Sequence, residues 1–328
     1  MTDLADLGIL RRAGLLPAGR YLDAVWLVRD HRFWAVWAAR ALLALGVVHL
    51  LAGIVFFFAY NWADMPPVSK FATVQTGIVL AVAGAWAAGL DRPAGQAFLT
   101  GATVLLGVLL AVIGQVYQTG ADAFELFLAW TLLALPWALA SRSAAHWLVW
   151  VTIAATAAGL TSHQAWVPMG WLESDDAALP VGLVLAAALV GREAAAGRGA
   201  RWLRPAWTRQ ILAFAALAAL FLGGIGYVLD FSDGVLSTAV FLIVAAGASV
   251  WFWRLAPDFA ALAQVLFFAA LPVMAAGFRL IGEAAGDPWD SEAELLATTL
   301  LWAGWFILVT GALGVALRRL RRRTAGAA

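Results

Sequence analysis

Long apolar stretches separated by short polar segments dominate the pattern along this chain. Most of them approach the roughly 20 residues that an α-helix needs to cross the hydrocarbon core of a bilayer. They cover residues 41–59, 71–90, 98–113, 123–140, 144–160, 177–190, 211–229, 235–253, 259–280 and 295–317. The pattern predicts an all-α fold, a polytopic transmembrane helix bundle of about ten spans, in which the sixth span is the shortest.

Composition indicates the same class of protein. Hydrophobic residues make up 63% of the 328 residues and charged residues only 12%, against roughly 45–50% and 25% in soluble domains. We therefore predict an integral membrane protein whose helices contact the lipid bilayer. The net charge of +1 gives no basis for binding nucleic acid.

The distribution of positive charge predicts an orientation. Nineteen of the 21 Lys and Arg residues fall on one side of the ten-span pattern, and only Lys70 and Arg279 fall on the other. Because cations close to span ends stay mostly on the cytoplasmic side, we expect both termini in the cytoplasm. Without the short sixth span, the five Arg residues between 191 and 210 would lie on the wrong side, so the charges support that span.

Three regions follow from this pattern. Residues 1–40 form a cytoplasmic N-terminal region with amphipathic stretches at 3–12 and 20–30, residues 41–317 form the transmembrane bundle with a cytoplasmic connector at 191–210, and residues 318–328 form a basic cytoplasmic tail. The first 40 residues lack the apolar core and cleavage site of a removable signal peptide. The abundance of Ala and the excess of Arg over Lys indicate a multi-pass protein of a bacterial inner membrane.

Motifs of known reaction chemistry do not occur in the sequence. The chain has no cysteine, which excludes disulfides, thiolate metal ligands and cysteine nucleophiles. Its four His residues are spread over both sides and the middle of the membrane, so no shared metal site is expected. No metalloprotease, hydrolase or phosphate-loop motif is found. We therefore expect no enzyme, no catalytic residue, no metal site and no cofactor.

One connecting segment is unusually polar. GQVYQTGAD, residues 114–122, joins the third and fourth spans on the predicted outer side. Its side chains Gln115, Tyr117 and Gln118 supply neutral donors and acceptors that suit a small polar ligand. The alternative is structural, because Asp122 and Glu125 have the spacing of a capping box at the start of the fourth span, and the Gln side chains can satisfy backbone groups that lipid cannot.

The same segment resembles part of a known family. GQVYQTGAD after an apolar helix, together with LAGIVFFFAYNWADMP (residues 51–66) at the end of the first span, is similar to the DUF2157 family of predicted bacterial membrane proteins. The resemblance implies a polytopic membrane protein and adds no catalytic residue. It also implies that Asn61, Trp62 and Asp64 belong with the 115–122 segment to one outer-face feature.

Arg279 completes the set of candidate residues. It lies near the outer end of the ninth span and is expected to pair with Glu283 on the same helix face, with capture of a substrate anion as the alternative. The candidate ligand-binding residues are therefore Asn61, Trp62, Asp64, Gln115, Tyr117, Gln118, Asp122 and Arg279.

Two segments share a pattern that suggests an internal repeat, although their alignment requires gaps. IGQVYQTGADAFELFLAW (residues 113–130) and IGEAAGDPWDSEAELLATTLLW (residues 281–302) both run from Ile-Gly through an acidic loop into an apolar helix. An offset of six spans keeps both copies in the same orientation. Such a parallel repeat is found in some transporters.

The sequence supports two functional hypotheses. The first is a solute-binding permease or channel-like protein, whose outer-face vestibule takes a small polar solute. The second is a non-transporting membrane scaffold or envelope-sensing subunit that acts through a membrane-protein partner. The polar segment and the repeat motivate the first hypothesis, whereas the amphipathic N-terminus and the lack of acids inside the spans motivate the second.

Overall fold

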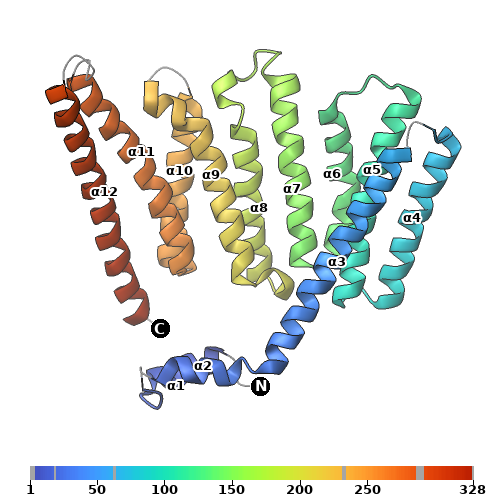
Figure 1. Ribbon diagram of the computed structural model, residues 1–328, viewed down its shortest axis with the longest axis horizontal. Coiled ribbons are helices and arrows are strands. Elements are labelled where there is room, and N and C mark those ends of the chain that lie inside the picture. The colour runs from blue at the N-terminus through green and yellow to red at the C-terminus, as the bar shows by residue number, and fades with distance from the viewer. Residues whose placement is uncertain (1–3, 18–19, 62–63, 231–233, 286–291, 327–328) are drawn as a thin grey trace. The chain divides into compact units, whose positions relative to one another are not determined.

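The protein is an assembly of long helices (Figure 1). The computed structural model describes residues 4–17, 20–61, 64–230, 234–285 and 292–326. In these residues ten helices are long and apolar enough to cross a membrane, one for each predicted stretch, and no strand occurs. The predicted all-α membrane fold is therefore confirmed. The chain divides into two compact units, unit 1 (Met1–Thr73) and unit 2 (Val74–Ala328).

Unit 1 contains the amphipathic region and the first span. The helices α1 (Leu4–Arg12) and α2 (Tyr21–Val28) match the two predicted amphipathic stretches. The helix α3 (His31–Asn61) begins well before the apolar stretch, because residues 31–40 contain no Gly or Pro that would end a helix. Asp30 caps its first turn, since the Asp30 Oδ1 accepts a hydrogen bond from the Phe33 N–H at 2.9 Å.

Unit 2 contains the remaining spans. They are α4 (Pro67–Ala88), whose first turns belong to unit 1, α5 (Pro93–Tyr117), α6 (Ala123–Ala140), α7 (Ala144–Thr161), α8 (Leu179–Gly197), α9 (Ala206–Asp230), α10 (Val235–Val250), α11 (Phe259–Ala285) and α12 (Glu292–Gly326). Four single turns, η2 (Ser162–Trp166), η3 (Ser174–Asp176), η4 (Arg201–Leu203) and η5 (Trp251–Leu255), lie between them. Helices that follow each other in the chain lie side by side from α6 to α12 (Figure 1).

Two helices of unit 2 extend beyond their apolar stretches. The helix α8 covers residues 179–190 of the short sixth span and continues to Gly197, so the first part of the predicted 191–210 connector is helical. The helix α12 continues through the basic tail to Gly326. Arg, Leu and Ala are good helix formers, and cations near a helix C-terminus interact favourably with the helix dipole.

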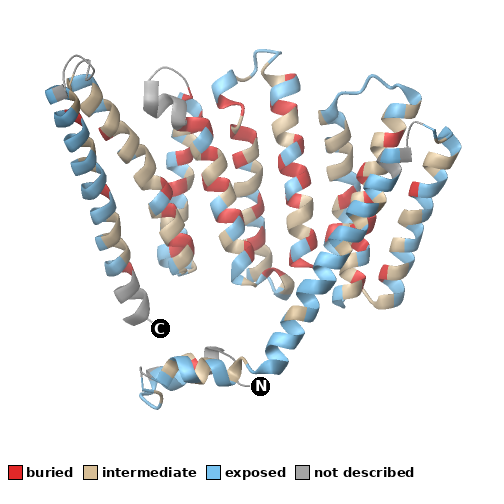
Figure 2. Ribbon diagram, viewed as in Figure 1, coloured by how far each residue is buried: buried red, intermediate tan, exposed pale blue. Residues whose placement is uncertain are grey.

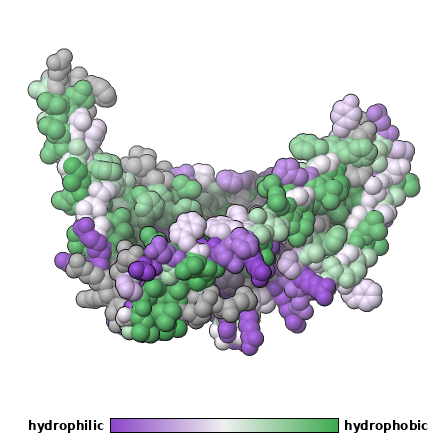
Figure 3. All heavy atoms as spheres, turned by 60° about the horizontal axis from the view of Figure 1, so that its bottom comes forward, coloured by the Kyte–Doolittle hydropathy of each residue, from purple (hydrophilic) through white to green (hydrophobic). Residues whose placement is uncertain are grey.

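Apolar clusters hold unit 2 together. The larger cluster includes Leu217 and Leu220 of α9, Phe241 of α10 and Phe268 of α11. Figure 2 shows buried residues on these central helices, and many pale exposed positions on the same ribbons. Large apolar side chains such as Ile243 remain exposed, and hydrophobic residues cover much of the surface in Figure 3. Such exposure is expected where helices face lipid.

Trp side chains join neighbouring helices through backbone carbonyls. Trp130 of α6 donates its indole N–H to the carbonyl of Thr103 on α5 at 2.8 Å, and Trp150 of α7 donates to Thr131 of α6 at 2.8 Å. Gly107 of α5 makes room for the first ring, because a Cβ there would lie 2.5 Å from Trp130 Cζ2. An indole N–H inside a bilayer finds no water, so a carbonyl of the next helix satisfies it.

The two segments of the predicted repeat take equivalent places in two helix pairs. Residues 113–130 join α5 to α6, and residues 281–302 join α11 to α12. The Trp that ends each segment donates to a carbonyl of the preceding helix: Trp130 to Thr103, and Trp302 to Phe278 at 2.9 Å. The shared contact supports the repeat, which stays a prediction.

Candidate functional site

The predicted ligand-binding segment forms a short connection between α5 and α6. Gln115 and Tyr117 lie in the last turn of α5, and the Tyr117 side chain is 68% exposed. Gln118 ends the helix in the left-handed conformation (φ 47°, ψ 47°), and its N–H donates to the carbonyl of Gly114. Gly120, with φ 67°, completes the turn. The segment thus presents exposed polar side chains on a defined backbone.

The acids that follow stabilise the start of α6. Asp122 is the N-cap residue, and the Glu125 carboxylate accepts a hydrogen bond from the Asp122 N–H at 3.2 Å, which confirms the predicted capping box. A more distant residue adds a second cap, since Gln164 Oε1 of η2 accepts from the Phe124 N–H at 3.0 Å. Asp122 therefore has a structural role, and Gln115, Tyr117 and Gln118 remain as ligand-binding candidates in this segment.

The other predicted site residues lie elsewhere. Asn61 is the last residue of α3, Asp64 is exposed in the turn before α4, and Trp62 is outside the described residues. Arg279 lies on α11, which is separated from α5 and α6 by the intervening helices of unit 2 (Figure 1). Its Nε donates to Glu283 Oε1 at 2.7 Å, as its spacing predicts. The structure therefore does not bring Arg279 to the α5–α6 segment.

A buried histidine in α7 contacts a threonine of α5 that also binds α6. His146 lies in the first turn of α7, and its Nε2 is 2.8 Å from the Thr103 Oγ1 of α5. The Thr103 carbonyl also accepts the indole N–H of Trp130 on α6. Thr103 therefore links α5 to both α6 and α7. Among the described residues, no group of three His, Cys, Asp or Glu side chains could hold a metal ion.

A buried ion network, which no sequence pattern indicated, lies at the end of α8. Arg192 is only 1% exposed. Its Nε donates to Thr208 Oγ1 at 3.2 Å, and its Nη2 donates to the carbonyls of Arg204 at 2.9 Å and Pro205 at 3.1 Å. Its Nη1 donates to the Glu193 carboxylate. A buried charge is tolerated when its hydrogen-bonding groups are paired in this way.

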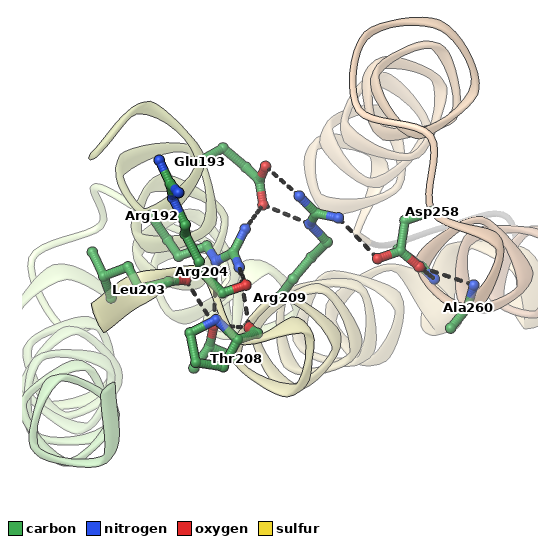
Figure 4. Close-up of polar contacts among 10 residues, drawn as sticks. Arg192, Glu193, Leu203, Arg204, Thr208, Arg209, Asp258 and Ala260 are labelled. Carbon is green, nitrogen blue, oxygen red and sulfur yellow. Dashed lines mark hydrogen bonds and ion pairs between the residues drawn. The ribbon is translucent and has the colours of Figure 1, made fainter. Parts of the chain in front are cut away.

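The network continues through Arg209 to a third helix (Figure 4). The Arg209 Nε and Nη2 donate to the two carboxylate oxygens of Glu193 at 2.7 and 2.9 Å, and its Nη1 donates to Asp258 Oδ2 at 2.9 Å. Asp258 Oδ1 in turn accepts from the N–H groups of Ala260 and Ala261 at the start of α11. Two cations and two anions thus balance each other and fasten α8, α9 and α11.

A cleft of about 530 Å³ opens at the helix ends that the charge pattern predicts to be cytoplasmic, here called the basic ends, and segments far apart in the sequence line it. It is lined by Asp91, Gln96, Arg142, Gly199, Ala200, Arg201 and Trp202. Asp91 comes from the turn between α4 and α5, Gln96 from the first turn of α5, and Arg142 from the turn between α6 and α7. The last four come from the turn after α8 and the short helix η4. None of them was a sequence-predicted site residue.

Comparison with known proteins identifies a membrane-protein family and nothing more specific. No curated protein and no solved structure matches the chain. A match to a family model begins in α1 and ends in α7, so it includes both motifs on which the resemblance was based. The family model is DUF2157, described as a predicted membrane protein, and it matches residues 10–147, less than half of the chain.

Proposed function

We propose that this protein is a solute-binding permease or channel-like protein of a bacterial inner membrane, and not an enzyme, with Gln115, Tyr117 and Gln118 as its outer ligand contacts. The conformation of Gln118 carries the proposal. It is one of two non-glycine residues with positive φ in the part of the chain that the structure describes. Such a conformation costs on the order of 1 kcal/mol for a residue with a Cβ, so a Gln at this position indicates that its amide has a use.

The surroundings of Gln118 favour binding. The Asp122–Glu125 capping box and the Gln164 cap fix the start of α6 four residues beyond it. A fixed backbone lowers the entropy that is lost when a ligand binds. Because amides and a phenol are neutral donors and acceptors, the chemistry suits a neutral polar solute such as a polyol or a sugar.

The test uses purified protein in nanodiscs and a panel of neutral polar solutes. We expect at least one solute to raise the midpoint of thermal unfolding, and the same solute to enter proteoliposomes. The variant Gln118→Gly keeps the left-handed backbone and removes the amide, so it should abolish the shift. The matched variant Gln118→Asn keeps an amide in a residue that tolerates this conformation, and should retain part of it.

Two results would remove this proposal. One is that no solute in the panel shifts the unfolding midpoint. The other is that the shift persists after Gln115→Ala, Tyr117→Ala and Gln118→Gly are combined.

A non-transporting scaffold or sensing subunit is the second candidate, and one feature of unit 1 favours it. The N-terminal region exposes large apolar side chains, among them Leu15 (72%), Trp26 (68%) and Leu27 (80%). A membrane-protein partner would cover such a surface. Deletion of residues 1–31 should then remove a partner that co-purifies after mild crosslinking. If the same partners co-purify after the deletion, and the full chain takes up solute, the permease hypothesis is favoured over the scaffold hypothesis.

A further inference from the structure

The cleft at the basic ends of the helices has a positively charged lining and room for a small molecule. Arg142 and Arg201 both line it, and neither forms an ion pair within the described ranges. They differ in this respect from Arg192 and Arg209, whose charges are balanced by the buried network. Among the described residues of the lining, Asp91 is the only acid, so they carry a net positive charge.

The turn that carries Arg142 is built rigidly. Ser141 and Ser143 on either side of it are buried, and the Ser141 hydroxyl donates to the Ala138 carbonyl at 3.0 Å. Ser143 caps α7 by accepting a hydrogen bond from the His146 N–H at 3.4 Å. Arg142 itself is exposed and has φ 44°. The two serines therefore fix the turn from inside, while Arg142 faces the cleft.

The opposite wall is fixed in a different way. Leu203, the last residue of η4, is only 3% exposed and anchors the turn that carries Arg201 and Trp202. The Trp202 ring contacts Trp147 of α7 edge to face, with centroids 6.3 Å apart. Gly199, with φ 108°, permits the chain to reverse between α8 and η4. Both walls are thus positioned before any ligand arrives.

We propose that this cleft binds a phosphate ester whose organic part carries a hydroxyl or an amino group. Guanidinium groups match phosphate oxygens in charge and in planar donor geometry. Gln96 lies in the first turn of α5, where the helix dipole also favours an anion. The Asp91 carboxylate would repel a bare phosphate and accept a hydrogen bond from a hydroxyl or ammonium group. The cleft volume lies within the range of small-molecule sites and exceeds what inorganic phosphate needs.

Two sources can supply this chemistry, and the experiment separates them. One is a soluble phosphate ester, and the other is the headgroup of an anionic phospholipid. Full-length protein in dodecyl maltoside, which contains no phosphate, is titrated with glycerol phosphate by calorimetry. In a second arm, phosphatidylglycerol or diacylglycerol is added to the micelles, and lipid retained by the protein is measured by native mass spectrometry.

Three variants test the role of the side chains. Arg142→Gly removes a guanidinium and suits the left-handed backbone, so the fold is kept. Arg201→Gln removes the second guanidinium. Arg198→Gln is the matched control, because Arg198 is exposed in the same turn but does not line the cleft. We expect each of the first two changes to weaken binding about tenfold or more, and the control to leave it unchanged.

Each outcome decides the proposal. Binding of glycerol phosphate assigns a soluble ligand, whereas selective retention of phosphatidylglycerol assigns a lipid headgroup. Failure of both probes to bind overturns the proposal. Binding that survives Arg142→Gly and Arg201→Gln, or that Arg198→Gln weakens equally, also overturns it, because general positive charge would then explain the result. None of these outcomes depends on the proposed outer ligand contacts.

Discussion

Ion pairs among the described residues at the two ends of the unit 2 helices differ in how far apart their partners lie in the chain. At the ends predicted to be outside, Arg279 pairs with Glu283, four residues later on the same helix. At the basic ends, Glu193 pairs with Arg209, 16 residues later, which pairs with Asp258, 49 residues later. The first kind of contact stabilises one helix, whereas the second fixes how three helices pack.

The two turns that flank α6 show a similar difference between a local segment and a site built from distant segments. Gln118 precedes it and Arg142 follows it, and these are the non-glycine residues with positive φ among those described. Gln118 lies in a segment of one continuous stretch of chain, which the Asp122–Glu125 capping box and one more distant cap from Gln164 fix in place. Arg142 faces a cleft whose other walls come from the start of α5 and from the turn after α8. A local turn can present a side chain, but a site with several walls needs distant segments to meet.

The largest expected effect is a difference in labelling from outside the cell. The predicted orientation assigns the two ends of the unit 2 helices to opposite sides of the membrane. Because the chain has no cysteine, a single introduced Cys reports its own position. In intact cells, Gln118→Cys should react completely with a membrane-impermeant maleimide, and Arg198→Cys should react only after permeabilisation. The reverse labelling would exchange the two faces, and equal labelling would contradict the span count between these residues.

A large loss of stability is expected when the buried ion network is broken. Glu193→Gln removes the charge between Arg192 and Arg209 while keeping the shape, and leaves Arg192 buried without its carboxylate. Breaking a buried pair in this way costs about 3–5 kcal/mol. The matched change Glu283→Gln breaks an exposed pair, which contributes about 0–1 kcal/mol.

Titration of both variants with SDS in mixed micelles measures their free energies of unfolding. Equal losses would mean that the long-range network contributes no more than the exposed pair. In that case the difference between the two ends would be one of geometry and not of energy.

Most of the fold could be predicted from the sequence because hydropathy and charge are properties of single segments. Even the short sixth span was supported by the Arg residues that follow it. The ends of helices were less predictable. Arg192 and Glu193 continue α8, and the Arg residues near residue 320 continue α12, because charged residues with long side chains are good helix formers that a hydropathy pattern excludes.

The candidate site was predictable only where the partners are close in sequence. Spacings of three and four residues predicted the Asp122–Glu125 and Arg279–Glu283 contacts. The sequence predicts only that Arg192 belongs to the cytoplasmic connector at 191–210. Its burial depends on Thr208 and on the carbonyls of Arg204 and Pro205, which a sequence pattern does not place. The lining of the cleft is likewise scattered from residue 91 to residue 202.

A moderate effect is expected from the local cap at the outer end of α6. Asp122→Ala removes the N-cap and should lower the free energy of unfolding by about 1 kcal/mol. Thr119→Ala is the control, because the Thr119 hydroxyl accepts only one long hydrogen bond, from the Ala121 N–H at 3.4 Å. Denaturation of both variants under the same conditions measures the difference. A loss as large as that of Glu193→Gln would show that the outer segment is more than a local cap.

The smallest effect concerns the left-handed conformations themselves. Gln118→Gly and Arg142→Gly should each raise the free energy of unfolding by about 0.5 kcal/mol, since glycine adopts positive φ without steric cost. The same substitution at Gln115, in the last turn of α5, should instead lower it, because glycine has a low helix propensity. Gln118→Val and Arg142→Val should also lower the free energy of unfolding, because β-branched residues tolerate this conformation least.

The glycine variants separate strain from function. If Gly stabilises both turns but abolishes solute binding at Gln118 and phosphate-ester binding at Arg142, the two side chains are retained for their ligands. If Gly stabilises neither, the conformations carry no strain, and the reason to assign a ligand contact to Gln118 disappears, whereas the cleft beside Arg142 keeps its own evidence in two cations and a volume that suits a small molecule.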